Sequence, residues 1–507
     1  MKGCEVLIVG AGPTGLVLAL WLSKLGVRVR IIDRTAGPGT TSRALAVQAR
    51  TLELYRQLDL TAAVIERGHR VPAANLWVKG EAAARLPFSA IGADLTPYPF
   101  LHIYPQDEHE QLLIDRLQTF GVEVERQTEL LGFNQDGQGI SAQLRHAGGL
   151  EERCDAAYIA GCDGARSTVR KALDIGFPGG TYQQVFYVAD VQASGPALNG
   201  ELHVDLDEAD FLAVFPLAGS GRARLIGTVR DERAEHPDQL RFEDVSQRAM
   251  SHLKVQVEQV NWFSTYRVHH RVAEQFGRQR AFLLGDAAHV HSPAGGQGMN
   301  TGIGDAINLA WKLASVLRGR ARDSLLETYG IERSAFARRL VATTDQVFNF
   351  ITADGRLATL LRTRLAPLLI PRVAAFRSAR EFLFRTVSQI TLNYRDMPLS
   401  VGSAGHVQGG DRLPWVAEGG RDNFSGLNRM CWQVQVYGAV GADLVKWCGE
   451  RGIPVDVFTW SDAHEAAGLM RDAVYLLRPD SYIALAWSNA GAQVLQQYFD
   501  ERELRSL

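Results

Sequence analysis

The chain has 507 residues, 46% of them hydrophobic and 22% charged, with a formal net charge of -2. This is an ordinary globular composition, and its nearly balanced charge excludes a nucleic acid or anionic membrane held by bulk charge. The length predicts about three domains. No run of 18 apolar residues and no signal-peptide pattern occur, so we expect no membrane span and a cytoplasmic protein. The scattered, odd-numbered cysteines, without a CxxC pair, fit a reducing compartment: Cys4, Cys154, Cys162, Cys431 and Cys448.

The first readable segment is a strand–turn–helix–strand unit near the N-terminus. An apolar strand, 6–9, leads into a GxGxxG turn with Pro13 in the first helical turn, and a helix then ends at Gly26. A second strand, 27–32, ends at Asp33. The first glycine permits the tight turn, the second lets backbone N–H groups approach a pyrophosphate, and the third lets helix and strand pack closely. The helix N-terminus favours phosphate, and Asp33 can accept from ribose hydroxyls, so the unit predicts a bound NAD or FAD.

Three later segments carry further motifs. They are "TTSRALAVQARTLEL" at 40–54, "CDGARSTVR" at 162–170 and "GDAAHVHSPAGGQGMN" at 285–300. The last is a glycine-rich loop that follows an apolar strand, and its Asp286 therefore falls at the carboxyl edge of a sheet, where α/β folds bind ligands. We expect a helix to begin at about Asp305 and to direct its N-terminus back toward this loop.

Two histidines in the loop need an interpretation of their own. His289 and His291 form an HxH pair, which is one way to bind a metal ion. A catalytic zinc site needs three protein ligands, and only Asp286 stands nearby. We therefore expect no metal site, and we interpret both histidines as loop residues beside the ligand without a catalytic role.

In combination, the motifs resemble a known family. GxGxxG, DG at 163–164 and GDxxxxxxP at 285–293 are similar to the three fingerprints of the p-hydroxybenzoate hydroxylase-like (group A) flavoprotein aromatic monooxygenases, and they occur in that family's order. The resemblance spans about the first 400 residues. It implies tightly held FAD, NADPH or NADH as a transient reductant, and hydroxylation of a phenolic or polyketide-like aromatic by O2 through a flavin hydroperoxide. It also implies a monomer or homodimer that binds no nucleic acid.

The resemblance also assigns the FAD contacts. It implies that Asp33, where the family more often has Glu, binds the adenosine ribose, that Asp286 binds the ribityl chain and that Pro293 borders the reactive face of the flavin. Backbone N–H groups of 295–300 would stabilise the negative charge of reduced flavin. The full implied set is Gly10, Gly12, Pro13, Thr14, Gly15, Asp33, Arg34, Arg43, Gln106, Leu130, Asp163, Asp286, Pro293, Gly296, Gly298, Met299 and Asn300. No residue pattern identifies the base that would activate a phenol.

A second domain is predicted between the fingerprints. Residues 182–230 contain period-two patches typical of antiparallel strands, and the family places such a sheet over the flavin. Phe211 and Phe215 could face an aromatic substrate or could equally belong to an ordinary core. His203 is a polar candidate for the same pocket, and Pro293 would border it. The predicted fold class is therefore α/β, with a Rossmann-like FAD-binding domain at 1–175 and 265–398 and an antiparallel-sheet substrate domain at 176–264.

The C-terminal part of the chain predicts a third domain. The segment 320–393 is helical in pattern and is interpreted as core or subunit packing. Six glycines within 399–420 predict a linker. "GGDRLP" and "RPDSYIALAW" resemble the beginning and the closing hairpin of a thioredoxin-like domain, at 421–507, that lacks the CxxC redox pair.

Two alternatives to hydroxylation stay open on sequence alone. The same flavoprotein scaffold can carry out epoxidation, Baeyer–Villiger-type insertion or oxidative decarboxylation. A flavin-binding protein without turnover is the second alternative.

Overall fold

The computed structural model describes residues 3–39, 44–78, 80–88, 92–206, 211–229, 240–245, 247–292, 296–352, 381, 384–489 and 491–505. The first region is built on a six-stranded sheet of order β18-β19-β12-β1-β2-β8. All neighbouring strands are parallel except the edge pair β18–β19. The strands are β1 Val6–Val9, β2 Val29–Ile32, β8 Val124–Glu125, β12 Tyr158–Gly161, β18 Gly277–Arg278 and β19 Ala281–Leu283. Because the chain leaves β1 toward β2 on one side and reaches β12 on the other, the strand order reverses at β1.

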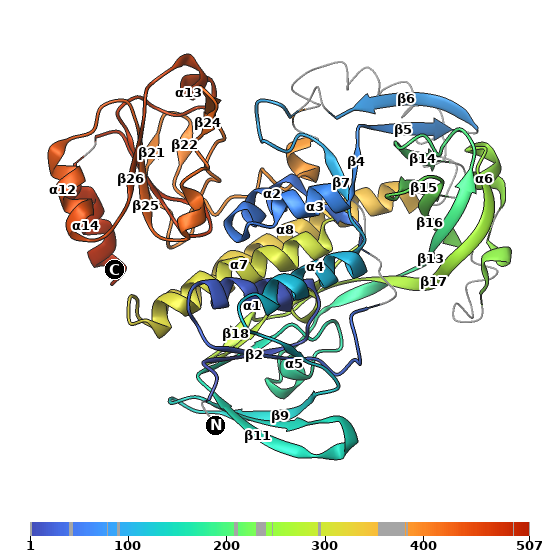
Figure 1. Cartoon of the computed structure of the whole chain (residues 1–507), viewed down its shortest axis with the longest axis horizontal. Helices are drawn as coiled ribbons and strands as arrows, with labels where there is room; N and C mark the ends of the chain where they lie inside the picture. Colours follow the sequence, from blue (N-terminus) through green and yellow to red (C-terminus); the bar gives the residue numbers. More distant parts are fainter. Residues whose placement is uncertain are drawn as a thin grey trace.

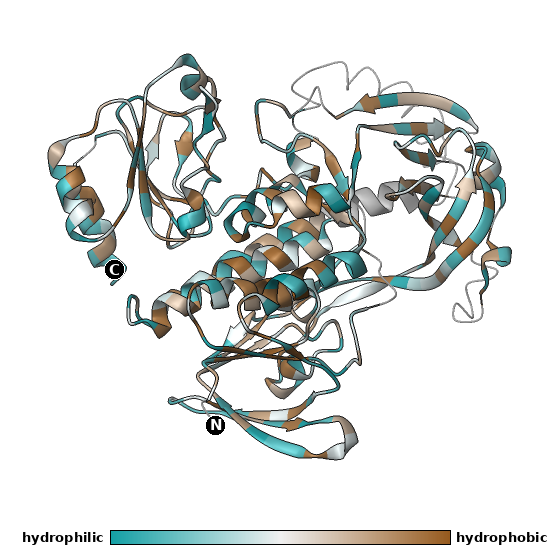
Figure 2. Cartoon of the chain, viewed as in Figure 1, coloured by the Kyte–Doolittle hydropathy of each residue, from teal (hydrophilic) through white to brown (hydrophobic). Residues whose placement is uncertain are grey.

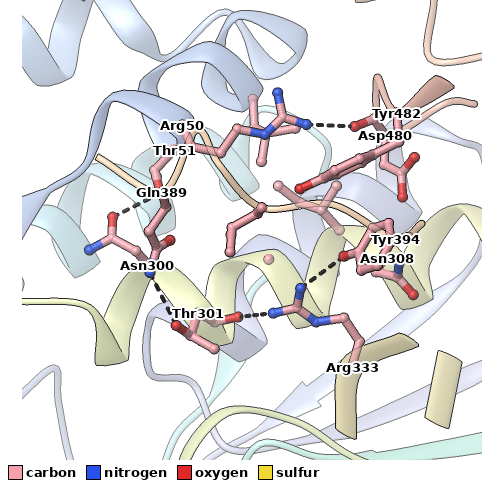
Figure 3. Close-up of a pocket in the computed structure, with 14 residues that line it drawn as sticks. Arg50, Thr51, Asn300, Thr301, Asn308, Arg333, Gln389, Tyr394, Asp480 and Tyr482 are labelled. Atoms are coloured by element: carbon pink, nitrogen blue, oxygen red, sulfur yellow. Dashed lines mark hydrogen bonds between the residues drawn. The ribbon is translucent and has the colours of Figure 1, made fainter. Parts of the chain in front are cut away.

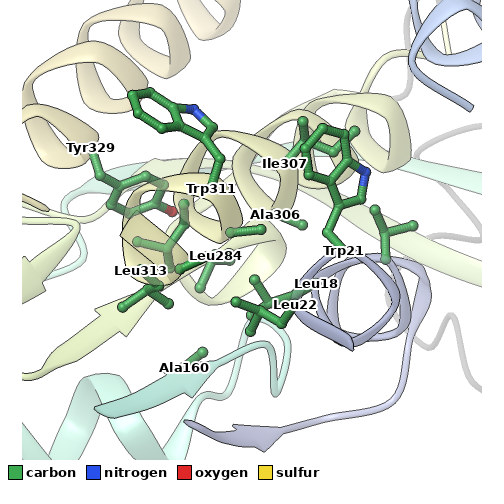
Figure 4. Close-up of a cluster of buried hydrophobic side chains, with 14 of the residues drawn as sticks. Leu18, Trp21, Leu22, Ala160, Leu284, Ala306, Ile307, Trp311, Leu313 and Tyr329 are labelled. Atoms are coloured by element: carbon green, nitrogen blue, oxygen red, sulfur yellow. The ribbon is translucent and has the colours of Figure 1, made fainter. Parts of the chain in front are cut away.

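Helices cover one face of this sheet, as Figure 1 shows. They are α1 Pro13–Lys24, α4 Gln106–Gln118 and α7 Gly298–Leu317. Figure 2 shows α1 as hydrophobic over most of its length. Its side chains Leu18, Trp21 and Leu22 pack with Ala306 and Trp311 of α7 in the buried cluster of Figure 4. Gly26, at φ +76°, ends the α1 segment in the left-handed conformation that a helix C-terminus favours.

The other face carries a three-stranded sheet of β9 Glu129–Gln135, β10 Ile140–Arg145 and β11 Glu151–Ala156. Between the first region and the second lie β3 Ala46–Val47, α2 Ala49–Tyr55, α3 Thr61–Arg67, β4 His69–Val71 and β7 Leu101–Ile103. The short helix α5, Thr168–Ala172, follows β12, and the long helix α8, Ser324–Thr352, follows α7. No helix among the described residues is both long enough and apolar enough to cross a bilayer.

The start of α7 differs from the prediction. The helix begins at Gly298 rather than at about Asp305. Gly302 and Gly304 lie inside its first two turns, where glycine lowers helix propensity and so hid the true N-terminus from the sequence pattern. A Cβ at Gly302 would overlap the Thr14 hydroxyl, so the close packing of α7 on α1 requires that glycine.

The second region is an eight-stranded sheet of order β20-β17-β13-β16-β15-β14-β5-β6. The strands are β5 Ala73–Val78, β6 Glu81–Pro87, β13 Gly179–Ser194, β14 Leu202–Leu206, β15 Phe211–Pro216, β16 Arg222–Val229, β17 Gln256–Val272 and β20 His289–Val290. The predicted antiparallel strands of 182–230 form its centre. The chain also adds β5 and β6 from much earlier in the sequence, and β5 joins β14 in parallel. Helix α6, Gln247–His252, packs with one apolar face of the sheet.

The third region is a four-stranded sheet of order β26-β25-β27-β28, in which β26 is parallel to β25 and the remaining pairs are antiparallel. Its elements are β25 Gln433–Tyr437, α12 Ala442–Glu450, β26 Val455–Phe458, α13 Asp462–Ala466, β27 Val474–Leu477, β28 Ile483–Trp487 and α14 Ala492–Glu501. Residues 399–420, predicted as a linker, contain the hairpin of β21 Ser403–Ala404 and β22 Val407–Gln408. They also contain β23 Ala417–Glu418, which pairs with β24 Arg421–Asp422. Leu413 and Val416 of this segment are buried in the core of the third region.

Candidate active site

The GxGxxG turn lies at the carboxyl end of β1, where the strand order reverses. Gly10 has φ +105°, and a Cβ there would overlap the carbonyl oxygen of Cys162 at the end of β12. A Cβ at Gly15 would overlap the carbonyl oxygen of Gly10. By contrast, apart from its own chain neighbours, no heavy atom of the described residues lies within 4 Å of the Cβ position of Gly12. Two of the glycines therefore serve packing, and the third leaves room beside the N-terminus of α1 for a phosphate group.

Asp33 connects the end of β2 to this turn. Its carboxylate oxygens accept hydrogen bonds from the backbone N–H of Ala11 at 2.7 Å and from that of Thr35 at 2.8 Å. The neighbouring side chain of Arg34 is exposed. Leu130 of β9 is buried in the core. The Asp33 carboxylate thus shapes the turn, and its remaining acceptor capacity is available to a ribose hydroxyl.

Sequence reasoning missed Glu110, which binds the predicted contact Gln106 and the loop at Gly39. Its buried carboxylate accepts from the Gln106 amide at 2.7 Å and from the Gly39 backbone N–H at 3.1 Å. Burial raises the pKa of Glu110, with the two hydrogen bonds opposing that shift. The i, i+4 spacing of Gln106 and Glu110 on α4 was the available signal. Glu110 therefore holds Gln106 in place beside the loop that contains Gly39.

Asp163, the aspartate of the DG motif, has one oxygen bound and one without a partner. Its Oδ2 accepts from the N–H groups of Thr168 and Val169, at 2.7 and 3.2 Å, at the start of α5. Its Oδ1 is buried and has no hydrogen-bond partner within the described structure. A buried carboxylate oxygen without a partner is costly, so this atom calls for a donor from outside the chain. Asp163 itself adjoins the Gly10 turn.

The loop at 285–300 is anchored from beneath by Asp305 of α7. Its carboxylate accepts from the Gly285 N–H at 3.0 Å, from His289 Nε2 at 2.7 Å and from Arg333 Nε at 2.6 Å. Burial alone would raise the pKa of Asp305, but Arg333 and His289 outweigh it and hold the pKa below its usual value. Asp286 is exposed between two buried neighbours, so the side chain of the aspartate in the GD motif is accessible.

The first turn of α7, at the end of the same loop, contains backbone N–H groups without intrahelical acceptors. The first intrahelical bond after the N-cap runs from Thr301 N–H to the Gln297 carbonyl, at 2.9 Å. The N–H groups of Gly298, Met299 and Asn300 precede it and so lack intrahelical acceptors. At the N-terminus of a 20-residue helix they carry partial positive charge. This end of α7 therefore favours an anionic group.

The Asn300 side chain holds this turn rather than projecting from it. Its Oδ1 accepts from the Gln48 N–H at 2.9 Å and from the Thr51 hydroxyl at 2.8 Å, while its Nδ2 donates to the carbonyls of Ala46 and Gly296 at 2.8 and 2.9 Å. Behind it, a cavity of about 20 Å³ separates α7 from α2 and the third region, with Arg50 and Tyr482 on its wall (Figure 3). That volume suits one water molecule and excludes an aromatic substrate.

The two loop histidines have separate partners. His289 pairs with Asp305 and stacks on Phe276 at 5.8 Å. His291 Nδ1 donates to the Ser292 carbonyl at 2.7 Å, which leaves Nε2 as a buried acceptor without a partner among the described residues. Burial lowers the pKa of His291 to about 4. Gly298 of α7 lies beside this nitrogen. Arg43 and Pro293, two further predicted contacts, lie outside the described residues.

The face of the eight-stranded sheet opposite α6 carries three parallel rows of side chains. The first row contains Phe211, Thr228, Phe186 and Tyr266, the second Ala213, Ile226, Val188 and Ser264, and the third Phe215, Arg224, Asp190 and Trp262. Small and aliphatic side chains thus lie between two rows that contain aromatics. Leu45 and Ala46 pack with this face, and a Cβ at Gly296 would lie 2.8 Å from the Ala46 Cβ. This face therefore adjoins the glycine loop.

His203 lies on the opposite face from Phe211 and Phe215. It pairs with Val214 across the antiparallel strands, and Val214 packs in the cluster that includes α6. Its Nδ1 accepts from Trp77 Nε1 and its Nε2 donates to Asn199 Oδ1, both at 2.9 Å. Both ring nitrogens are thus occupied, and the structure separates this candidate from the two phenylalanines.

Comparisons with known proteins agree with this geometry. Residues 3–344 match the FAD binding domain family. The chain is 37% identical over 416 residues to 6-methylpretetramide 4-monooxygenase of Streptomyces rimosus, covering 80% of this chain and 73% of that protein. It is 34% identical over 419 residues to pentachlorophenol 4-monooxygenase of Sphingobium chlorophenolicum, covering 81% and 75%. The chain belongs to the family of FAD-dependent aromatic monooxygenases. The solved structure of aklavinone-11 hydroxylase with FAD and aklavinone superimposes with a TM-score of 0.79 at 25% identity, covering 99% of each chain.

The residues of this monooxygenase fit the cofactor of its family. Bound FAD would bring its pyrophosphate to the open side of Gly12, its ribose and ribityl hydroxyls to Asp33 and Asp286, and a ring that becomes anionic on reduction to the first turn of α7. The partnerless oxygen of Asp163 and the partnerless nitrogen of His291 are buried polar atoms in residues beside Gly10 and Gly298, respectively. These two atoms suit a polar ligand that supplies hydrogen-bond donors.

Proposed function

We propose that this monooxygenase uses FAD and NADPH or NADH to add one oxygen atom from O2 to a phenolic or polyketide-like aromatic ring. The observation that carries the proposal concerns the face of the eight-stranded sheet opposite α6, which is called the inner face. On it, two rows with aromatic side chains flank a row of smaller ones. Residues two positions apart along a strand point to the same face, so each outer row lies roughly 7 Å from the middle row. A flat ring system fits between the outer rows against Ala213, Val188 and Ser264.

The polar pair on this face suits a substrate with oxygen substituents. Arg224 donates to both carboxylate oxygens of Asp190 at 2.6 and 2.7 Å, and its guanidinium lies 5.8 Å from the Trp262 ring. Arg224 is buried, whereas Asp190 is partly exposed. A phenol or polyketide hydroxyl can donate to the exposed part of this carboxylate. The names of the relatives, which act on a pretetramide and a chlorophenol, support the same substrate class.

The protein's part in the reaction is positioning, charge stabilisation and exclusion of water. Bound flavin, once reduced, supplies the electrons that activate O2 for transfer of one oxygen atom to the ring. The N–H groups at the start of α7 stabilise negative charge on the reduced ring system. The apolar side chains of the inner face keep water from the reacting atoms, and water there would favour loss of hydrogen peroxide without product.

We also propose that the third region is a thioredoxin-like domain with a structural role. The support is its sheet order, with the second strand parallel to the first and beside it, the third and fourth following antiparallel, and helices after the first and last strands. Cys431 and Cys448 are free and are not spaced as a CxxC pair, so no redox role follows.

A substrate panel tests the proposed function. Purified enzyme with FAD is mixed with NADH or NADPH and with phenols or tetracyclic aromatic polyketides, and reductant oxidation, O2 uptake and product mass are recorded together. We expect at least one aromatic to raise reductant oxidation about tenfold or more, with matched O2 uptake and a product carrying one added oxygen and an intact ring. A product with an inserted ring oxygen, an epoxide or lost CO2 would replace hydroxylation by that chemistry. No stimulation by any aromatic would contradict the proposal.

A further inference from the structure

Two thiols far apart in the sequence meet beside the first strand of the FAD-binding region. The Sγ atoms of Cys4 and Cys154 lie 3.9 Å apart although 150 positions separate the residues. Cys4 is half-buried and precedes β1, while Cys154 is buried in β11. The Glu5 carbonyl accepts from the N–H groups of Ala157 and Tyr158, at 3.0 and 3.1 Å. Backbone hydrogen bonds thus join the residue after Cys4 to the segment after Cys154 and hold the two thiols close together.

The surroundings set Cys154 apart from the other thiols. The hydrogen bond from Cys4 lowers the pKa of Cys154 to about 7 against the opposing effect of burial, and the Arg30 guanidinium adds to the lowering. Arg30 is itself fixed by ion pairs with Glu125 and Glu152 at 2.7 and 2.8 Å. Burial raises the thiol pKa at the three remaining positions: Cys162, Cys431 and Cys448. Since the thiolate is the reactive form, oxidation should select Cys154.

We propose that Cys4 and Cys154 form a peroxide-sensitive dithiol that closes to a disulfide in the folded protein. The oxidant is hydrogen peroxide. The Cys154 thiolate attacks one peroxide oxygen, the O–O bond breaks, and the leaving hydroxide takes up a proton to give water and a sulfenic acid. Cys4 sulfur then attacks Cys154 sulfur, the S–O bond breaks, and the Cys4 proton leaves with the hydroxide as a second water. Overall, two thiols lose two electrons to one peroxide and yield a disulfide and two waters.

Closure needs little rearrangement and has a structural consequence. A disulfide bond is about 2.05 Å long, so the two sulfurs must approach by about 2 Å from their 3.9 Å separation. The bond would tie the segment before β1 to β11 and close a long loop, which restricts the unfolded chain. Oxidation therefore should raise the thermal midpoint of unfolding. A flavin monooxygenase that releases peroxide without product would expose its own dithiol to the oxidant.

The test uses the full-length, FAD-loaded protein and added hydrogen peroxide, so its outcome does not depend on identifying a substrate. We expect thiols titrated after denaturation to fall from five to three, because two of the five free cysteines pair. Intact mass should fall by two hydrogen atoms, and a Cys4–Cys154 peptide pair should appear and vanish on reduction. Separate sulfenic or sulfinic acids, pairing with another cysteine, or five remaining thiols would each overturn the proposal.

Variants separate the two steps. Cys4→Ser should abolish the cross-link and leave Cys154 as a sulfenic acid that dimedone labels. Cys154→Ser should abolish both the cross-link and the label. Cys431→Ser is the matched control, because Cys431 is partly buried elsewhere in the chain, and it should still form the cross-link. Dimedone labelling of Cys4 rather than Cys154 in the unmodified protein would contradict the assigned order of attack.

Discussion

At the scale of single residues, the paired strands β14 and β15 carry two site candidates, His203 and Phe215, on opposite faces of the sheet. Phe215 is on the inner sheet face, whereas His203 faces the opposite side and binds Trp77 and Asn199. We expect Phe215→Ala to lower kcat/KM for the aromatic substrate about tenfold to a hundredfold, since a buried aromatic contact contributes roughly 1.5–3 kcal/mol. Steady-state kinetics with matched peroxide measurements would check this.

His203→Leu is the contrasting variant. It leaves the Trp77 N–H without its partner, so it should lower the free energy of unfolding by about 1–3 kcal/mol. Its kcat/KM should stay within about twofold of the unmodified enzyme, because the ring does not reach the inner face. A kinetic loss in His203→Leu as large as that in Phe215→Ala would contradict the assignment of faces.

The period of two predicted that Phe211 and Phe215 share a face, but it could not predict how the other face is covered. His203 and Asp205 alternate with apolar residues as in a sheet with one solvated face. Both are nevertheless buried, because Trp77 and Asn199 bind His203 and His252 binds Asp205 at 3.1 Å. Those partners come from distant segments, which local patterning does not reveal. The GxGxxG turn, by contrast, is a local structure and could be predicted in full order.

At the scale of elements, Asn300 joins α7 to β3 and α2. Asn300→Ala removes bonds to the Gln48 N–H and the Ala46 carbonyl, so we expect a loss of about 3 kcal/mol in unfolding free energy. Because the same side chain binds the Gly296 carbonyl, FAD affinity should fall about tenfold or more in a fluorescence titration. Ser315→Ala, on the same helix and far from the loop, is the control and should keep the affinity. Unchanged affinity in Asn300→Ala would show that this clamp does not hold the cofactor loop.

Two buried histidines between β7 and α4 predict the acid sensitivity of this packing. Burial lowers the pKa of His102 to about 4 and that of His109 to about 3. The unfolded chain binds protons at these sites below about pH 6.5, so unfolding becomes easier as the pH falls from 6.5 toward 4. Each site should cost about 2 kcal/mol between pH 7 and 5.

Urea unfolding at both pH values would measure that loss. His109→Phe should reduce the pH-dependent loss by about 2 kcal/mol, since it removes one buried site that must be protonated. His406→Gln, at an exposed position, should leave the loss unchanged. An equal loss in His109→Phe and in the unmodified protein would show that other groups control the acid response.

Across the whole molecule, a buried ion cluster connects the third region to helices α7 and α8. Arg478 donates to both Glu332 oxygens at 2.7 and 3.0 Å and to Asp480, whose carboxylate also accepts from Trp311 of α7 at 3.1 Å. Burial alone would raise the pKa of Glu332, but Arg478 and Lys312 outweigh it and hold the pKa at about 2. "RPDSY" was recognisable from its likeness to the family. Its pairing with α8 was not, because the partners lie 146 positions apart.

This cluster continues toward the glycine-rich loop at 285–300 through adjacent residues of α8. Glu332 binds Arg478, and the next residue, Arg333, binds the Asp305 that holds the Gly285 turn. One hydrophobic cluster also extends from the FAD sheet into the third region. We therefore expect the regions to unfold together, with FAD released in the same transition.

Arg478→Met tests this connection. It leaves the buried carboxylates of Glu332 and Asp480 without their main cation, so it should lower the free energy of unfolding by about 3–5 kcal/mol. Arg429→Met breaks a surface ion pair with Asp456 in the same region and should cost about 0–1 kcal/mol. Urea unfolding followed by circular dichroism, tryptophan fluorescence and flavin release should show one coincident transition in both variants. If Arg478→Met instead unfolds the third region first and keeps FAD until a second transition, the shared hydrophobic cluster alone does not couple the regions.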